Sequence, residues 1–227
     1  TAIVPRLPAI PIEQGTYSFS VASFDAAGTR VPATVRLTAI INQRDTPTVG
    51  VLPLRAFFVG TPGLDAANAA SSVPFQKILH QLRLAFGAIG IDVQLVDLVD
   101  IGGEPGTALA VLDVLDSTTD RIVPDRNLNR QSDEMDELFA LSGGRTGNVV
   151  NLFFVSEFFT QSGTVAVSGG VPGPSIVSGT NQSGIAVSTL GGLDQQSDSD
   201  LENVGFSLEV ELALYLGALG TVDPDNF

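Results

Sequence analysis

A chain of 227 residues with a net charge of -14 and no cysteine is long enough to bury a substantial core, and disulfide bonds cannot contribute to it. Lys77 is the only lysine, so DNA, RNA or an anionic membrane surface would be repelled, and we expect no nucleic-acid binding. No apolar run approaches the roughly 20 uncharged residues that a membrane-spanning helix needs, so no span is expected. The first residue is threonine rather than methionine, which suggests that a signal peptide, a pro-segment or another preceding stretch has been removed, and we expect a secreted or cell-surface protein.

The first 50 residues predict an arm and a hairpin. Residues 1–14 carry Pro5, Pro8 and Pro11 among apolar residues, which favours an extended arm over a helix. Two alternating runs, residues 16–24 and 31–41, flank a loop that contains Gly28, and residues 15–50 are therefore predicted to form a β-hairpin and a linker.

From residue 51 the pattern changes to alternating strands and helices. Residues 51–59 predict a buried strand, and Ser72 predicts the N-cap of a helix that ends near Gly87 or Gly90. Further segments are predicted in chain order: a half-buried strand over residues 91–99, an apolar stretch over 107–115, a short helix over 132–141, a strand over 148–159, a Gly/Ser/Pro-rich loop over 160–183, a short strand over 184–189 and a last helix from about Phe206. This order predicts one α/β domain over residues 51–227.

Residues 207–221, SLEVELALYLGALGT, contain the frame of a known zinc motif. The pattern His-Glu-x-x-His-x-x-Gly-x-x-His places two histidines one helical turn apart and a third beyond a glycine turn. In this chain the three histidine positions are occupied by Val210, Leu214 and Gly220, whereas Glu211 and Gly217 keep the glutamate and the turn glycine. The segment therefore resembles the active-site helix of a metzincin-type, pappalysin-like metalloprotease that has lost all three zinc-binding histidines.

The resemblance implies a metzincin-like N-terminal subdomain, with a mixed, twisted sheet packed against helices. It also implies an edge strand at Ile185 along the substrate cleft, and Glu211 at the position of the general base. The methionine-turn subdomain of the family is not expected within these residues, because the sole methionine, Met135, lies far upstream; it was never present, was removed, or belongs to a further segment.

Loss of the histidines argues against zinc, because Val, Leu and Gly side chains have no lone pair for a metal. We expect Val210 and Leu214 to pack in the core, with an exposed binding patch as the alternative. Glu211 is expected to face solvent or to pair with an arginine, with a residual role as a base as the alternative. The single histidine, His80, is expected at the surface.

An acidic stretch precedes the last helix and comprises Asp194, Asp198, Asp200 and Glu202. Carboxylates are calcium ligands, but the stretch lacks the spacing of a calcium-binding loop. Negative charge before a helix also interacts favourably with the helix dipole. We expect no cofactor, with calcium as the alternative.

These observations predict a non-catalytic, extracellular structural protein that self-assembles as a homo-oligomer, such as a filament or a surface assembly. The apolar arm, residues 1–14, is the expected partner of an exposed sheet edge in a neighbouring copy. Two alternatives are a module that recognises a peptide or polymer without cleaving it, in a former cleft around Val210, Leu214 and Ile185, and a divergent metal-dependent hydrolase.

Overall fold

The computed structural model describes residues 22–25, 27–34, 50–113, 133–159, 163–174 and 177–217. These residues belong to two separate units, whose boundary lies between Thr46 and Pro47. No helix in these ranges is both long and apolar enough to cross a membrane.

The first unit contains the turn of the predicted hairpin. Strands β1 (Ser23–Phe24) and β2 (Arg30–Val31) pair in antiparallel register. The Asp25 carboxylate accepts hydrogen bonds from the backbone N–H groups of Ala27, at 3.0 Å, and Thr29, at 2.8 Å. Gly28 has a φ of 78°, a conformation that glycine adopts at little cost. The hairpin is confirmed at its turn, whereas the arm and most of both predicted strands lie outside the described residues.

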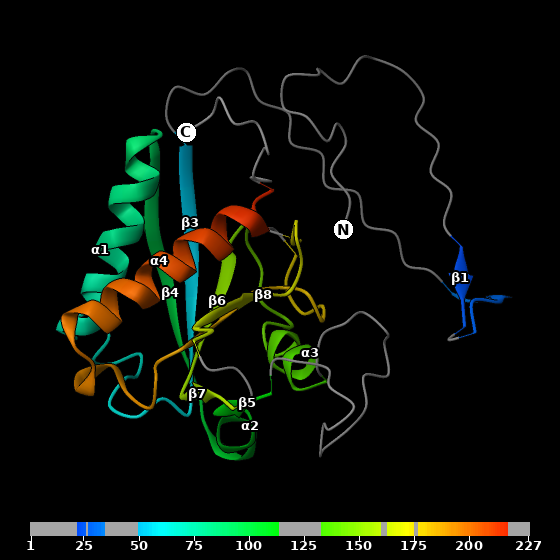
Figure 1. Ribbon diagram of the computed structural model, residues 1–227, viewed down its shortest axis with the longest axis horizontal. Helices are drawn as coiled ribbons and strands as arrows, with labels where there is room; N and C mark the ends of the chain where they lie inside the picture. Colours follow the sequence, from blue (N-terminus) through cyan, green and yellow to red (C-terminus); the bar gives the residue numbers. More distant parts are fainter. Residues whose placement is uncertain are drawn as a thin grey trace. The chain divides into compact units, whose positions relative to one another are not determined.

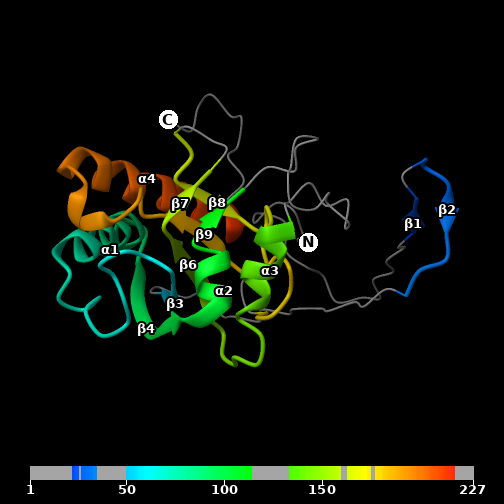
Figure 2. The same cartoon turned by 90° about the horizontal axis from the view of Figure 1, so that it is seen from below.

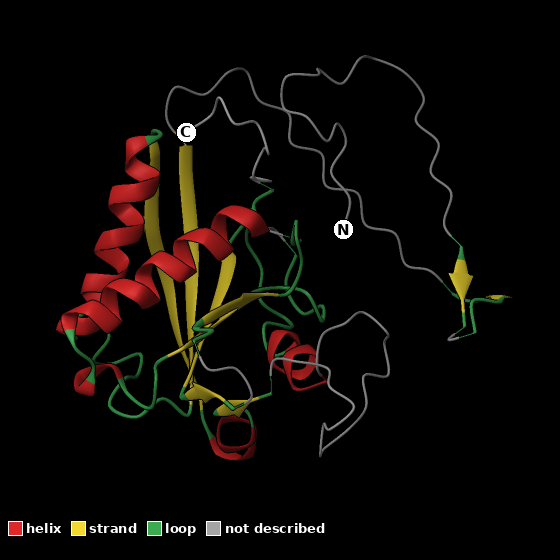
Figure 3. Cartoon of the chain, in the orientation of Figure 1, coloured by secondary structure: helices red, strands yellow, loops and turns green. Residues whose placement is uncertain are grey.

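The second unit is built on a mixed five-stranded sheet with strand order β4-β3-β6-β9-β8 (Figure 1). Four strands run parallel, and β8 pairs antiparallel with β9 at one edge. The bounds are β3 (Gly50–Val59), β4 (Ile91–Ile101), β6 (Val150–Val155), β8 (Ala166–Ser168) and β9 (Ile185–Ser188). A mixed sheet packed with helices confirms the predicted α/β class (Figure 3).

The edge strand differs from the prediction. Ile185 begins β9, which lies inside the sheet between β6 and β8 and has all four residues buried. The edge is β8, a strand of three residues within the segment that was predicted to be a loop. The prediction placed β9 at the edge because it missed β8. Strand β8 is short and lies among Gly and Ser residues, so it shows too few alternating positions to predict a strand.

Helices cover both faces of the sheet (Figure 2). Helices α1 (Val73–Ala88) and α4 (Asp198–Tyr215) pack on one face, and α3 (Asp133–Ala140) packs on the other. Three shorter elements complete the unit: the helix α2 (Gly103–Ala108), the 3-10 turn η1 (Leu193–Gln195), and a two-stranded parallel sheet of β5 (Val111–Leu112) and β7 (Glu157–Phe158).

Capping residues determine where the two long helices begin. Ser72 is the N-cap of α1, as predicted, and its hydroxyl accepts from the Phe75 N–H. Helix α4 begins at Asp198 rather than near Phe206, because Ser197 and Asp200 form a reciprocal capping box.

The core consists of two clusters separated by the sheet. Phe58, Phe75 and Phe154 lie between the sheet and helices α1 and α4, with ring centroids 5.2 to 5.9 Å apart. Phe57 and Phe153 stack at 4.5 Å on the opposite face, where α3 packs. Each face of an alternating strand therefore supplies one cluster, which gives a three-layer unit.

Candidate functional site

The outer face of α4 carries Val210 and Leu214, which stand where the zinc motif has its first two histidines. The residues that pack against the sheet recur at helical spacing: Leu201, Val204, Leu208, Leu212 and Tyr215. Val210 and Leu214 each lie two residues from Leu212, roughly 200° around the helix, and so point away from the core. Val210 is 40% exposed and Leu214 is partly exposed. The expectation that both side chains pack in the core is wrong, because the helix buries its other face.

Phe206 extends this apolar surface by one helical turn. Its side chain is 57% exposed, and it lies four residues before Val210. Phe206, Val210 and Leu214 form a line along the helix, here called the α4 ridge. Ile185 does not contribute to it, because that side chain is fully buried in the core beside the sheet. The concave surface predicted around Val210, Leu214 and Ile185 is therefore not formed by these three residues.

Glu211 is bound to the edge strand. One oxygen of its carboxylate, Oε2, accepts a hydrogen bond of 3.0 Å from the backbone N–H of Ser168 in β8. The side chain is partly buried, and β8 packs beside α4 (Figure 1). Among the described residues no arginine pairs with Glu211; the side chain is only partly exposed, and its partner is a backbone donor of β8.

The glycine at the turn position of the motif ends α4. Gly217 has a φ of 92°, a region that side-chain-bearing residues rarely adopt, and its N–H donates to the carbonyl oxygen of Leu214. Gly217 therefore ends the helix in a conformation that glycine adopts at little cost. Gly220 lies outside the described residues.

Tyr215 attaches the Gly/Pro-rich loop to the end of α4. The Gly173 N–H donates to the Tyr215 carbonyl oxygen at 2.9 Å, and the Tyr215 hydroxyl donates to the Gln182 carbonyl oxygen at 3.3 Å. A Cβ atom at Gly173 would lie 1.7 Å from the Tyr215 ring, so only glycine fits. Burial raises the pKa of the Tyr215 phenol well above its usual range, so the hydroxyl stays protonated even at alkaline pH where an exposed tyrosine ionises.

The acidic stretch surrounds the start of α4, and two of its members are used for capping and ion pairing. Asp198 pairs with Lys77 of α1, and Asp200 accepts from Ser197 in the capping box. Asp194 lies in η1, and Glu202 is exposed on α4. Within the described ranges, no group of three or more His, Cys, Asp or Glu side chains is arranged to hold a metal ion. The charges are placed where the positive end of a helix favours them.

His80 is exposed on α1, as expected. The same helix forms one wall of a groove for which the sequence gives no local signal. The groove has a volume of about 480 Å³ and lies between α1, which contributes Leu79 and Arg83, and residues 95–98 of β4. Val96 is 50% exposed there.

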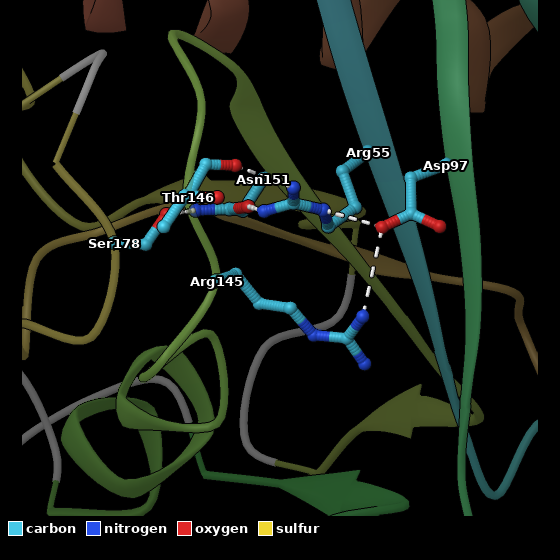
Figure 4. A network of polar contacts seen from close by, with 6 residues as sticks. All are labelled: Arg55, Asp97, Arg145, Thr146, Asn151 and Ser178. Carbon is cyan, nitrogen blue, oxygen red and sulfur yellow. Dashed lines mark hydrogen bonds and ion pairs between the residues drawn. The ribbon is translucent and has the colours of Figure 1, made fainter.

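A polar network on the opposite face of the sheet was also not predicted (Figure 4). Arg55 in β3 is directly opposite Asp97 of β4 and Asn151 of β6 in the strand register. Its Nε donates to Asp97 Oδ2 at 2.8 Å, Nη1 to Asn151 Oδ1 at 3.3 Å, and Nη2 to the Thr146 carbonyl oxygen at 3.0 Å. All three guanidinium nitrogens therefore have partners within the protein, which indicates a structural role.

The network extends to the loops beyond the sheet. Asn151 Nδ2 donates to the Ser178 hydroxyl at 3.2 Å and to the Ser183 carbonyl oxygen at 3.1 Å, and Arg145 Nη1 lies 3.7 Å from Asp97 Oδ2. The network joins the loop after α3 and the segment before β9 to the centre of the sheet.

Neither a protein-family model nor a curated protein matches this chain.

Proposed function

We propose that the chain is a non-catalytic, self-assembling protein built on a metalloprotease-like scaffold. The observation that carries the proposal is the surface of α4, which keeps the frame of the zinc motif but presents apolar side chains at two ligand positions. Val210 and Leu214 offer no lone pair to a metal, although both reach the surface where a ligand would have to lie.

The contact of Glu211 supports a structural use of the former catalytic position. A general base must lie within hydrogen-bond reach of the proton that it removes. One carboxylate oxygen of Glu211 is instead bound by the Ser168 N–H, which holds the last helix against the edge strand. A carboxylate in this role stabilises the packing of α4 on β8 and needs no metal-bound water.

Self-association is supported by the unequal edges of the sheet. One edge, β8, has only three residues, which offers little length for pairing. The other, β4, has 11 residues, and among the described parts of the chain only β3 pairs with it. Long unpaired edges are sites where another chain adds a strand, and natural proteins usually block or occupy them.

Restoring the histidines tests the scaffold. We expect the variant Val210→His/Leu214→His/Gly220→His to bind zinc at least about 100-fold more tightly than a two-histidine control on the same helix. Glu202→His/Phe206→His is that control, because its residues are also four apart and exposed. Equal affinities, measured by chelator competition, would contradict a metalloprotease-like arrangement.

Two measurements on the unmodified chain test the other parts of the proposal. Sedimentation velocity over a concentration series should show association, and a chain that stays monomeric throughout would refute self-assembly. Metal analysis should find no stoichiometric metal. A generic peptidase assay, with and without added zinc or calcium, should show no turnover. Stoichiometric metal with turnover would instead support the divergent hydrolase.

The α4 ridge supports a second candidate function, recognition of a peptide or polymer without cleavage. The ridge places three apolar side chains in line on a helix: Phe206 and Val210 are exposed, and Leu214 is partly exposed. Such a line resembles the surface that binds an amphipathic partner. Phe206→Ser/Val210→Ser should abolish such binding and leave self-association unchanged. A variant that loses self-association would place the assembly contact on the ridge instead.

A further inference from the structure

The outer edge of β4 has backbone groups that face away from the sheet. Arg83 Nε donates to the Val93 carbonyl oxygen at 3.4 Å from the α1 side, so this carbonyl points away from β3. Alternate residues of a strand present their N–H and C=O groups to the same edge and their side chains to the same face. Leu95 therefore shares the orientation of Val93. Val96 is the extra residue of a bulge, so Leu98 is the next residue with that orientation.

The unpaired part of this edge coincides with the groove. Leu95 and Leu98 pack partly against the α1-side core, and no hydrogen bond joins their outward backbone groups to another described residue. The groove runs along residues 95–98, and Gln76, Leu79 and Arg83 form its opposite wall. An open strand edge beside a groove walled by a helix is suited to an extended segment that adds as a strand.

We infer that this groove binds residues 2–7 of a second copy of the chain, as a strand parallel to β4. The inference rests on the proposed self-assembly and gives it a site. Residues 1–14 lie outside the described part of the chain, and six residues of extended chain span about 20 Å, a length close to that of the free stretch from Leu95 to the end of β4.

The positions of the prolines select residues 2–7 and fix which of them bond to β4. Proline has no N–H, so it can occupy only positions whose backbone faces away from the partner strand. If Ala2, Val4 and Arg6 face β4, all three supply an N–H and Pro5 faces outward. Pro8 then falls on the bonding side and ends the paired stretch. The alternative alternation would place Pro5 in the middle of the bonding side.

Charge and hydrophobicity select the parallel direction. In a parallel pair, the residues that bond to the outward groups of Leu95 and Leu98 have side chains on the opposite face, which is the face of Asp97. Arg6, the only charged residue among residues 1–12, would then lie on the same face as Asp97 and diagonally across from it, within reach of a carboxylate that is 35% exposed. Ile3 and Leu7 would enter the groove beside Leu79. Antiparallel pairing would instead direct Arg6 toward Arg83.

An outward Pro5 would also end the sheet. The added strand would offer no N–H at its centre, so a further strand would pair poorly. Each copy has one donor segment and one acceptor edge. Reciprocal exchange gives a closed dimer, and one-way donation gives a linear assembly.

Matched substitutions in the full chain test the site by sedimentation velocity. Val96→Lys places a charge on the acceptor edge and should weaken self-association at least about tenfold, whereas Phe206→Lys, also at an exposed apolar residue, should leave it unchanged. Val4→Pro removes an inward N–H and should weaken association similarly, whereas Ala9→Pro lies beyond Pro8 and should have no effect. Association that is insensitive to Val96→Lys and Val4→Pro would overturn the inference and leave self-assembly intact. A chain that is monomeric at every concentration would refute both.

Cross-linking tests the direction of pairing, since the chain has no cysteine of its own. Mixing Leu7→Cys with Gln76→Cys should trap a disulfide-linked dimer under mild oxidation, because both side chains would lie in the groove. Leu7→Cys mixed with Phe206→Cys should not. A Leu7→Cys/Gln76→Cys double variant that cross-links only within single chains would overturn the proposed exchange between copies, as would equal trapping at Phe206.

Discussion

Replacing Arg55 by methionine should destabilise the sheet where β3, β4 and β6 share one polar network. The change removes a side chain that is 7% exposed, together with its hydrogen bonds to Asp97, Asn151 and the Thr146 carbonyl. Removing one partner of a fully buried ion pair costs about 3–5 kcal/mol. Because the Asp97 carboxylate is 35% exposed and regains water, we expect a smaller loss of unfolding free energy, about 2–3 kcal/mol.

Arg145→Met is the matched control. Its guanidinium lies 3.7 Å from the same Asp97 oxygen, but the side chain is 42% exposed, so we expect a loss of about 0–1 kcal/mol. Urea unfolding followed by far-UV circular dichroism measures both values, and an unchanged m-value would show that stability rather than compactness has changed. Arg55→Met/Asp97→Leu should recover part of the loss, because it leaves no unpaired carboxylate. If the two single variants agree within about 0.5 kcal/mol, the buried network does not stabilise the sheet as argued.

Three further predictions concern α4 and the glycines. Because burial raises the pKa of Tyr215, the unfolded chain loses the phenolic proton first as the pH rises. The unfolding free energy should therefore be unaffected below pH 10.0, the ordinary pKa of a tyrosine, and should fall above it. Subtracting the pH profile of Tyr215→Phe isolates this effect. Glu211→Ala leaves the Ser168 N–H without its acceptor and should lower the free energy of unfolding in urea by about 1–2 kcal/mol. Glu211→Gln keeps an acceptor oxygen, so its loss should be less than half of that. Equal losses would contradict the contact. Gly173→Ala should lower the free energy of unfolding by at least about 2 kcal/mol, because the added methyl meets the Tyr215 ring. Gly87→Ala, in α1 with open space around the added methyl, should raise it by about 0.5–1 kcal/mol. Thermal unfolding measures both, and a tolerated Gly173→Ala would contradict the close approach to Tyr215.

Elements with a strong local signal were predicted from the sequence. Helix α1 has an N-cap serine and a periodic apolar face, and β3 and β6 are nearly continuous apolar runs, so each shows its type without its neighbours. Strand β8 could not be recognised, because three residues become a strand only when β9 lies beside them. The start of α4 depends on the capping box at Ser197, which precedes the apolar part of the helix.

The candidate site was predicted in part. The motif located Glu211 and the turn glycine Gly217, because both positions belong to one helix and its end. The Ser168 partner of Glu211 is 43 residues away in sequence, and the partners Asp97 and Asn151 of Arg55 are 42 and 96 residues away. Such contacts depend on strand register and helix packing, which local periodicity does not specify. The exposure of Val210 does follow a local rule, because Val210 lies opposite the apolar stripe of α4. The stripe begins upstream of the residues predicted to form the helix, so the buried face was not recognised from the predicted part alone.

The ion pair between Lys77 and Asp198 has a practical consequence. Lys77 is the only lysine of the chain, and its side chain is 47% exposed on α1. With the N-terminal amine blocked, an amine-specific dye attached to Lys77 would lie at the same place in every copy, on the helix that also forms one wall of the groove beside β4. Energy transfer between donor- and acceptor-labelled molecules would then report how far apart neighbouring α1 helices stand in an assembly.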